Sequence, residues 1–290
     1  MVMGKGDIGQ HTVQQYNEDL ENLHRAVLDM GRLVLEQLED GIAALEGNDK
    51  ELATRVLRRD VEVNTLEVHL DKECQRILVR RQPAAGDLRL IFAVIKTVTD
   101  LERIGDQVGH VARAVLESDP GSPNRPHAAL AHLASLVRTN CARTMESFAS
   151  LDVALALQVA QADLEVNREY QGSMRQLLTY IMEDPRTTSS ALQLAWTARA
   201  LERIGDHAKN IAEYVIYMVH GEDVRHISDE ERRQRLAPSI SAKWVNEFCV
   251  FEKLTVVLLP VATKSTSMLF HAYAAEVATA LWMATLHQVM

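Results

Sequence analysis

The sequence is poor in aromatic residues, glycine, proline and cysteine. Aromatic residues make up 5% of its 290 positions, and it has 13 glycines and 7 prolines. Strands and their turns rely on these residue types, so the composition argues against a sandwich, a barrel or a doubly wound sheet and favours helices. The three cysteines, Cys74, Cys141 and Cys249, lie far apart and form neither a disulfide framework nor a CxxC zinc motif, which fits a reducing cytoplasm.

Positive charge and catalytic signatures are also lacking. The formal net charge is −9, so we do not expect a protein that binds nucleic acid. The first 15 residues are polar and contain no apolar stretch of the secretory type, so no signal peptide is expected. We find no glycine-rich phosphate loop, no GxSxG and no HExxH, so we do not expect an enzyme.

What the sequence does contain is helical periodicity in long stretches between prolines. Apolar residues step by three and four from Leu23 to Leu45, and the same spacing recurs from Val94 to Val115 and from Leu194 to Val215. Proline or a Gly-Asn-Asp turn ends each stretch. Three long helices with short connections indicate an antiparallel bundle. The expected helices span about residues 23–47, 50–81, 86–118, 127–150, 151–183 and 188–220.

The pattern occurs twice. The hexapeptide Leu-Glu-Arg-Ile-Gly-Asp stands at 101–106 and again at 201–206, and Asp60 and Asn64 recur in the same order as Asp163 and Asn167. This indicates a tandem duplication of a unit of about 100 residues. We therefore predict an all-α protein of two tandem, pseudo-symmetric three-helix bundles with an atypical tail. The expected parts are a first repeat at 10–119, a linker at 120–126, a second repeat at 127–230 and an apolar tail at 231–290.

The tail has a different composition. Only 6 of the 54 residues from 237 onward are charged. The stretch from Met268 to Met290 is apolar enough to be considered as a membrane span, but Glu276 lies in its middle and His271 and His287 near its ends. We expect instead a helix packed on the bundle or an extension without regular structure.

The duplicated hexapeptide carries two carboxylates next to the core. Glu102 and Asp106 are four residues apart, so they project from one helix face, and the second helix of the repeat adds a polar row. Carboxylates that converge from neighbouring helices build multi-metal sites, and oxygen ligands suit Mg²⁺, Mn²⁺ or iron. The candidate metal ligands are Asp60, Asn64, Glu102 and Asp106 in the first repeat and Asp163, Asn167, Glu202 and Asp206 in the second.

Other interpretations of these residues stay open. Glu-x-x-x-Asp is common on solvated helix faces, and His110 or Asn210 could extend the ligand rows. The second repeat has Tyr170 and Met174 where the first has Glu67 and Asp71, which argues against two equal clusters. A metal-free helical scaffold and a di-metal carboxylate enzyme are therefore alternatives to a metal-containing regulator.

Two long segments resemble the PhoU family of phosphate-specific transport system accessory proteins and phosphate signalling regulators. The first combines 74–91 with 100–106, and the second combines 180–185 with 201–213; the resemblance extends over about residues 10–230. It implies two pseudo-symmetric three-helix bundles and multinuclear clusters of Fe, Zn, Mg or Mn at the candidate ligands. The tail from 237 onward departs from the family pattern.

The resemblance also implies a role. Family members are cytoplasmic, often homodimeric and not enzymes, and they lie only peripherally at membrane complexes. They repress the phosphate-starvation (Pho) response and phosphate uptake. Their partners are the PhoR-type sensor histidine kinase and the PstB-type ATPase of the phosphate importer.

Overall fold

The computed structural model describes residues 5–81, 83, 85–118, 130–225 and 231. All of them belong to one compact unit, residues 1–237. The expected linker at 120–126 lies outside the described residues, and so does the expected tail at 231–290 apart from residue 231. Within the described ranges, no helix is long and apolar enough to cross a membrane.

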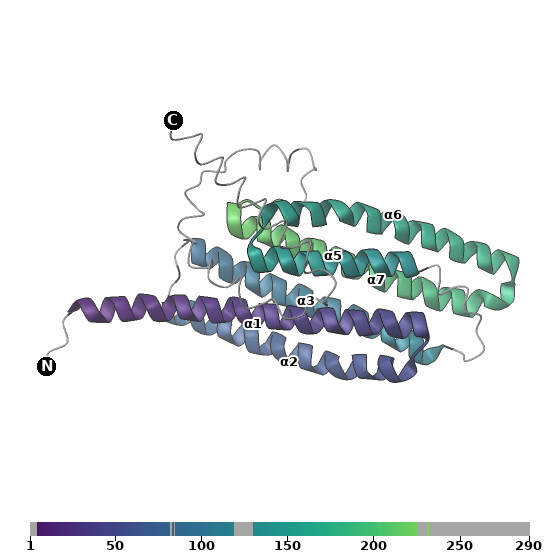
Figure 1. Ribbon diagram of the computed structural model, residues 1–290, viewed down its shortest axis with the longest axis horizontal. Coiled ribbons are helices and arrows are strands. Elements are labelled where there is room, and N and C mark those ends of the chain that lie inside the picture. The colour runs from purple at the N-terminus through teal and green to yellow at the C-terminus, as the bar shows by residue number, and fades with distance from the viewer. Residues whose placement is uncertain (1–4, 82, 84, 119–129, 226–230, 232–290) are drawn as a thin grey trace, which may run out of the picture. The chain divides into compact units, whose positions relative to one another are not determined.

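The described part of the chain is helical and contains no strand, which confirms the all-α prediction (Figure 1). The expected and observed bounds agree most closely for the helices at 50–81 and 188–220, the first of which begins after a capping aspartate and ends before a proline. The elements are α1 (Lys5–Gly47), α2 (Lys50–Arg81), α3 (Ala85–Glu117), α5 (Ala131–Ser150), α6 (Val153–Glu183), the short 3₁₀ helix η1 (Pro185–Thr187) and α7 (Thr188–His220).

The first turn of each repeat is built in the same way. Asn48 and Leu151 have positive φ angles of 51° and 52°, which ends α1 and α5 in a left-handed residue. The next residue is an aspartate, Asp49 or Asp152, whose Oδ1 accepts a hydrogen bond at 3.0 Å from the backbone N–H three residues on. This side-chain cap starts α2 and α6. The same hydrogen bond thus recurs at the same place in both repeats, which supports the duplication.

The predicted apolar stripes form the core. The α1 stripe from Leu23 to Leu45 is buried throughout, and the stripes of α3 and α7 that carry the hexapeptides are buried as well. Because these three stripes keep the helical period over their whole length, α1, α3 and α7 each present one continuous apolar face to their neighbours. The expected amphipathic organisation is confirmed.

The two repeats meet through their third helices. Contact between α3 and α7 is the most extensive of any helix pair in the described residues, while α2 packs on α3, α6 on α7 and α1 on α5. The pair is antiparallel, since Asp100 lies beside His207 and Gln193 Nε2 donates to Ala114 O at 3.1 Å. Both hexapeptides therefore lie on the helices that join the repeats.

Candidate functional site

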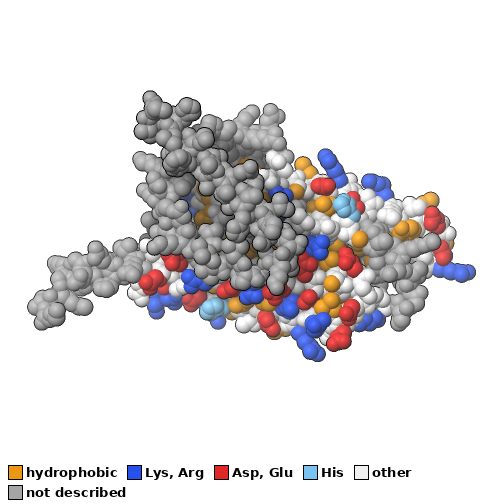
Figure 2. All heavy atoms as spheres, viewed as in Figure 1, with side chains coloured by type: hydrophobic (Ala, Val, Ile, Leu, Met, Phe, Trp, Pro, Cys, Tyr) orange, Lys and Arg blue, Asp and Glu red, His pale blue; other side chains and the backbone are white. Residues whose placement is uncertain are grey.

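Several surface carboxylates of the described residues pair with arginines. Acidic and basic side chains are interspersed on the described part of the face seen in Figure 2. Typical pairs are Arg32 with Glu36 at 3.0 Å and Arg59 with Asp40 at 2.8 Å. Exposed pairs of this kind contribute about 0–1 kcal/mol each. The carboxylates of the duplicated motif behave differently.

The first cluster consists of Asp60 and Glu67 from α2 and Glu102 and Asp106 from α3. Burial raises the pKa of Glu102 to about 7, with further contributions from the charges of Asp106, Glu67 and Asp60. Burial and neighbouring carboxylates, including Asp106, also raise the pKa of Glu67. No described Lys, Arg or His forms an ion pair with any of the four within 4.0 Å. The cluster is thus a concentration of negative charge that the charge of Arg103 offsets only in part.

This repulsion predicts a pH dependence of stability in the metal-free protein. The folded-state pKa of Glu102, about 7, exceeds its ordinary value of 4.5, so between these values the folded state binds more protons and the free energy of unfolding falls as pH rises. Allowing for solvent screening, we expect the wild type to lose about 1 kcal/mol more than Glu102→Gln between about pH 5 and about pH 8. Urea denaturation in EDTA measures this difference.

Comparing the wild type with Glu102→Gln also cancels the contribution of His24, which changes stability with pH in the opposite direction. Burial lowers the pKa of His24, so this residue favours the folded state as pH rises, but it does so equally in both proteins. If the wild type and Glu102→Gln show the same change in stability with pH, the proposed repulsion at Glu102 is wrong.

Gln37 on α1 belongs to the first cluster and was missed by the sequence analysis. Its Nε2 donates to Asp60 Oδ1 at 3.3 Å and to Gly105 O at 3.4 Å. The side chain is fully buried, and its Oε1 has no hydrogen-bond partner among the described residues. An amide oxygen without a donor costs about 1–3 kcal/mol in such a place unless something else binds it.

The second cluster consists of Asp163 from α6 and Glu202 and Asp206 from α7. Asp163 is 2% exposed, and its Oδ2 accepts from Asn167 Nδ2 at 3.1 Å and Lys209 Nζ at 3.3 Å. Burial is the main cause of the raised pKa values of Glu202 and Asp206, and charges within the cluster add to it. Asp163 Oδ1 and Glu202 Oε2 are buried without a hydrogen-bond partner in the described part of the chain.

A glycine in each hexapeptide lets the carboxylate helices approach. A methyl group on Gly105 would lie 3.5 Å from Asp60 Oδ1, and one on Gly205 would lie 3.7 Å from Asp163 Oδ1 and 3.0 Å from Val166 Cγ1. Neither position has a positive φ angle, so the absence of a side chain serves helix packing and not an unusual backbone conformation.

The close packing of α6 and α7 at Gly205 can be tested by comparing an alanine substitution there with one at Gly172, where space is open. We expect Gly205→Ala to destabilise the protein by about 1–2 kcal/mol, because the added methyl displaces Val166. Gly172 lies inside α6 with nothing within 4 Å of the added carbon, so Gly172→Ala should stabilise by about 0.5–1 kcal/mol. Urea denaturation of the two variants measures both values, and a stabilising Gly205→Ala would contradict the packing role.

The remaining predicted ligands have varied positions. Asp60, Asp106 and Asn167 are half-buried, whereas Asn64 is exposed. His110 is also exposed and lies 3.4 Å from an Arg113 nitrogen. None of these positions tests metal binding by itself.

Asn210, the other residue considered as an extension of the ligand rows, faces α3. Its Nδ2 donates to Asp100 Oδ1 at 3.4 Å, and His207 Nδ1 lies 2.7 Å from the same oxygen. Asp100 is 4% exposed and also raises the pKa of Tyr214 through a hydrogen bond and its charge, after the larger effect of burial. These four residues form a buried polar connection between the repeats that the sequence analysis did not foresee.

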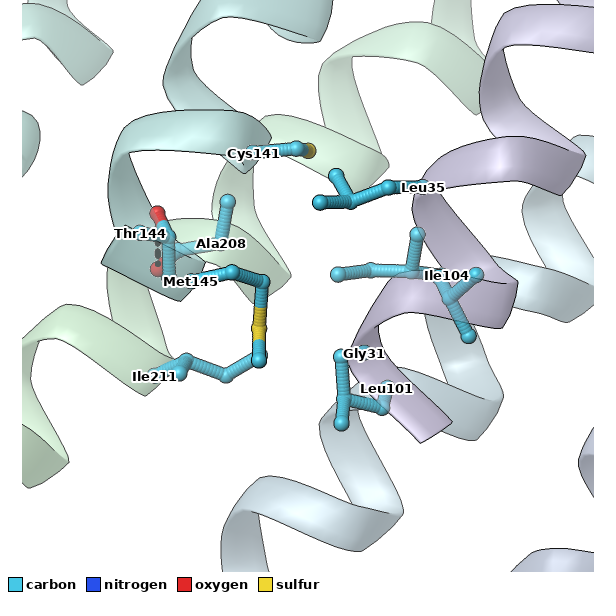
Figure 3. Close-up of a pocket in the computed structure, with 10 residues that line it drawn as sticks. Gly31, Leu35, Leu101, Ile104, Cys141, Thr144, Met145, Ala208 and Ile211 are labelled. Carbon is cyan, nitrogen blue, oxygen red and sulfur yellow. Dashed lines mark hydrogen bonds between the residues drawn. The ribbon is translucent and has the colours of Figure 1, made fainter. Parts of the chain in front are cut away.

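A small cavity between α1, α3, α5 and α7 has a different character (Figure 3). The Met145 side chain lies against Gly31 there, and Thr144 Oγ1 donates to Ala208 O at 3.3 Å. Burial raises the pKa of the Cys141 thiol in its wall to about 12, so this group stays protonated at neutral pH. The lining offers apolar contacts and no carboxylate, so charged ligands would not be bound here.

The donor chemistry of the two carboxylate clusters fits a hard divalent cation. Their ligands are oxygens, and several are buried without a hydrogen-bond partner among the described residues. Burial, together with neighbouring carboxylates, raises the pKa of Glu102 and Glu202, and a bound cation would oppose this effect. In the described residues, no three His, Cys, Asp or Glu side chains are yet arranged to hold a metal ion. The carboxylates would have to turn toward a common point to bind one.

The fold and site together define a class: a duplicated helical-bundle protein whose repeats each carry a carboxylate cluster beside the core. The PhoU domain family model matches residues 27–115 and again 130–215. The chain belongs to the PhoU family. It is 47% identical over 227 residues to a protein of Pseudomonas aeruginosa named "Phosphate-specific transport system accessory protein PhoU homolog", covering 78% of this chain and 94% of that protein.

Another curated relative and two solved structures also support membership of the PhoU family. The Escherichia coli "Phosphate-specific transport system accessory protein PhoU" is 40% identical over 240 residues, which cover 82% of this chain and 98% of that protein. The crystal structure of PhoU from Pseudomonas aeruginosa superimposes with a TM-score of 0.70 at 47% identity, covering 71% of this chain and all of that one. The Streptococcus pneumoniae PhoU structure gives 0.67 at 27% identity, covering 72% of this chain and 99% of that one.

Proposed function

We propose that this protein is a cytoplasmic accessory regulator of phosphate transport and not an enzyme. The observation that carries the proposal is the match to a relative named for the phosphate-specific transport system, which covers 94% of that relative's length. The match of the family model to each of the two repeats supports a role for both of them. As a negative regulator, the protein limits phosphate uptake and the phosphate-starvation response when phosphate is plentiful.

We infer two partners for this role, a PhoR-type sensor histidine kinase and the PstB-type ATPase of the phosphate importer. The protein acts as a homodimer that contacts these membrane complexes from the cytoplasmic side. An amphipathic helical surface on an acidic protein offers a docking face for a helix of such a partner.

Affinity capture from phosphate-replete cells tests the role. The full-length protein carrying a small tag should recover the kinase and the ATPase from detergent extracts, and deletion of the gene should raise the expression of phosphate-uptake genes. A deletion strain with normal repression would overturn the regulatory proposal. Loss of repression without recovery of either protein would overturn the proposed contacts alone.

The proposal includes metal clusters built on the two carboxylate clusters, with Asp60, Glu102 and Asp106 in one and Asp163, Glu202 and Asp206 in the other. A bound cation would supply the positive charge that these groups lack, and it would stabilise the folded state in proportion to its affinity. Fe, Zn, Mg and Mn all accept oxygen ligands, and elemental analysis of the purified protein would identify which is present.

A metal-free scaffold is the second candidate. The close pairing of Lys209 with Asp163 favours it, because a lysine can replace a metal as the counter-charge of a carboxylate. The midpoint of thermal unfolding with and without a chelator distinguishes the two candidates. A metal-containing protein should unfold at a lower temperature after EDTA treatment, whereas a scaffold should be unaffected.

A further inference from the structure

Three substitutions between equivalent positions of the two carboxylate clusters change the charge in the same direction. Equivalent residues are 103 apart in α2 and α6 and 100 apart in α3 and α7, as the shared motifs show. One position loses a carboxylate in the second repeat, and two gain a cation there. The pairs are Glu67 with Tyr170, Thr99 with Arg199 and Gly109 with Lys209.

The gained cations are in contact with the second cluster. Lys209 Nζ lies 3.3 Å from Asp163 Oδ2, and an Arg199 Nη lies 2.7 Å from Glu202 Oε1. The Arg199 guanidinium is also 5.9 Å from the centre of the Tyr170 ring. The tyrosine that replaces the carboxylate of the first repeat therefore makes a cation–π contact with the new cation. Three carboxylates here face two built-in positive charges.

The first cluster lacks such contacts; the charge of Arg103 acts on Glu102 and Glu67 without an ion pair, as that of its equivalent Arg203 does on Glu202. Its four carboxylates form no ion pair with a described residue, and Gly109 places no side chain where the second repeat has its lysine. The buried Gln37 Oε1, which has no hydrogen-bond partner in the described part of the chain, would lie 3.2 Å from a methyl group on Gly105. This oxygen has no hydrogen-bond donor and lies beside carboxylates, which are also acceptors. A cation could bind the oxygen and the carboxylates together, whereas another acceptor could bind neither.

We propose that the first cluster is the high-affinity divalent-cation site of this protein, that Gln37 supplies it with an additional oxygen, and that Lys209 and Arg199 weaken the second cluster at least tenfold. This asymmetry rests on the metal half of the proposed function. A cation that enters the second cluster must displace or oppose two charges already there, whereas one that enters the first cluster relieves repulsion.

Titration of the full-length, metal-free protein with Mn²⁺ tests the assignment, with free Mn²⁺ followed by electron paramagnetic resonance. The wild type should show a tight and a weak class of sites. Glu102→Gln with Asp106→Asn should remove the tight class and leave the weak one, while Glu202→Gln with Asp206→Asn should do the reverse. If the second pair removes the tight class, or if the two classes are equal, the asymmetry is wrong.

Exchanging the charges gives the decisive comparison. Lys209→Met should tighten the weak class about tenfold, and Gly109→Lys should weaken the tight class by a similar factor. The Gly109 substitution has room, since the nearest atoms to its new carbon belong to Arg113 and Leu57 at 3.5 and 3.7 Å. Lys50→Met removes an equal charge from a lysine that bonds only backbone carbonyls of Leu116 and Ser118 in the described residues, and it should change neither class.

Gln37→Met tests the additional ligand. It keeps the length of the side chain but removes the amide oxygen, so the tight class should weaken at least fivefold while circular dichroism stays that of the wild type. Unchanged affinity would overturn the assignment of Gln37. A wild-type protein that binds no Mn²⁺ at either cluster would instead overturn metal binding in the proposed function, and the asymmetry with it.

Discussion

Replacing Glu102 with Gln and Asp106 with Asn should make the metal-free protein more stable and remove the larger part of its stabilisation by Mn²⁺. The metal-free gain comes from removing two charges from a cluster in which burial and repulsion raise the Glu102 pKa to about 7, and we expect about 1–2 kcal/mol after screening. The metal effect should be larger, about 3 kcal/mol at a hundredfold excess of Mn²⁺ over its Kd. Thermal unfolding in EDTA and in Mn²⁺ measures both effects.

The matched control replaces two exposed carboxylates of α1, Asp29 and Glu39, with Asn and Gln. Their side chains are 63% and 56% exposed and lie 3.9 and 3.5 Å from the nearest arginine nitrogens. This variant should keep the Mn²⁺ response and change stability by about 0.5 kcal/mol or less. If it responds to Mn²⁺ like the Glu102 and Asp106 variant, the effect of the ion is one of general charge and not of a site.

Asp100→Ala should destabilise the protein by about 2–4 kcal/mol, although Asp100 belongs to neither carboxylate cluster. Its removal leaves the polar groups of His207, Asn210 and Tyr214 buried between α3 and α7 without their shared acceptor. Chemical denaturation measures the loss. Because this connection joins the two repeats, we expect one cooperative transition with a lower midpoint.

Two further variants make this prediction specific. Asp223→Ala removes a carboxylate that is 51% exposed and paired with Arg225, and it should cost about 1 kcal/mol or less. His207→Ala combined with Asp100→Ala should cost clearly less than the two single changes together, because both remove the same interaction. Strictly additive losses would show that the two side chains stabilise the protein independently.

The helices were predictable because their signals are local. Capping aspartates, prolines and an unbroken apolar period stand next to one another in the chain, and α2 and α7 begin and end where those signals predict. The pairing of carboxylates within each hexapeptide was likewise predictable from a spacing of four residues. The prediction that the two clusters are unequal began from Tyr170 and Met174, where the second repeat departs from the first.

The rest of the site depends on contacts between residues distant in the chain. Gln37 is 23 residues from Asp60 and 68 from Gly105. Its place three residues after Val34 puts it on the buried stripe of α1, but the sequence does not say which groups its amide meets. Lys209 is 46 residues from Asp163, so its role required knowing how α6 and α7 pack. Asn64 shows the opposite limit, since periodicity placed it in the ligand row but the helix presents it to solvent.

The antiparallel contact of α3 with α7 has a consequence for how such a protein can diversify. A single repeat that paired with an identical copy through its third helix would show every substitution twice, and its two clusters would always be the same. Joining both copies in one chain frees each from the other's sequence. The second repeat has lysine at 209 where the first has glycine at the equivalent position, 109. Only such a fused, internally asymmetric dimer can carry this difference.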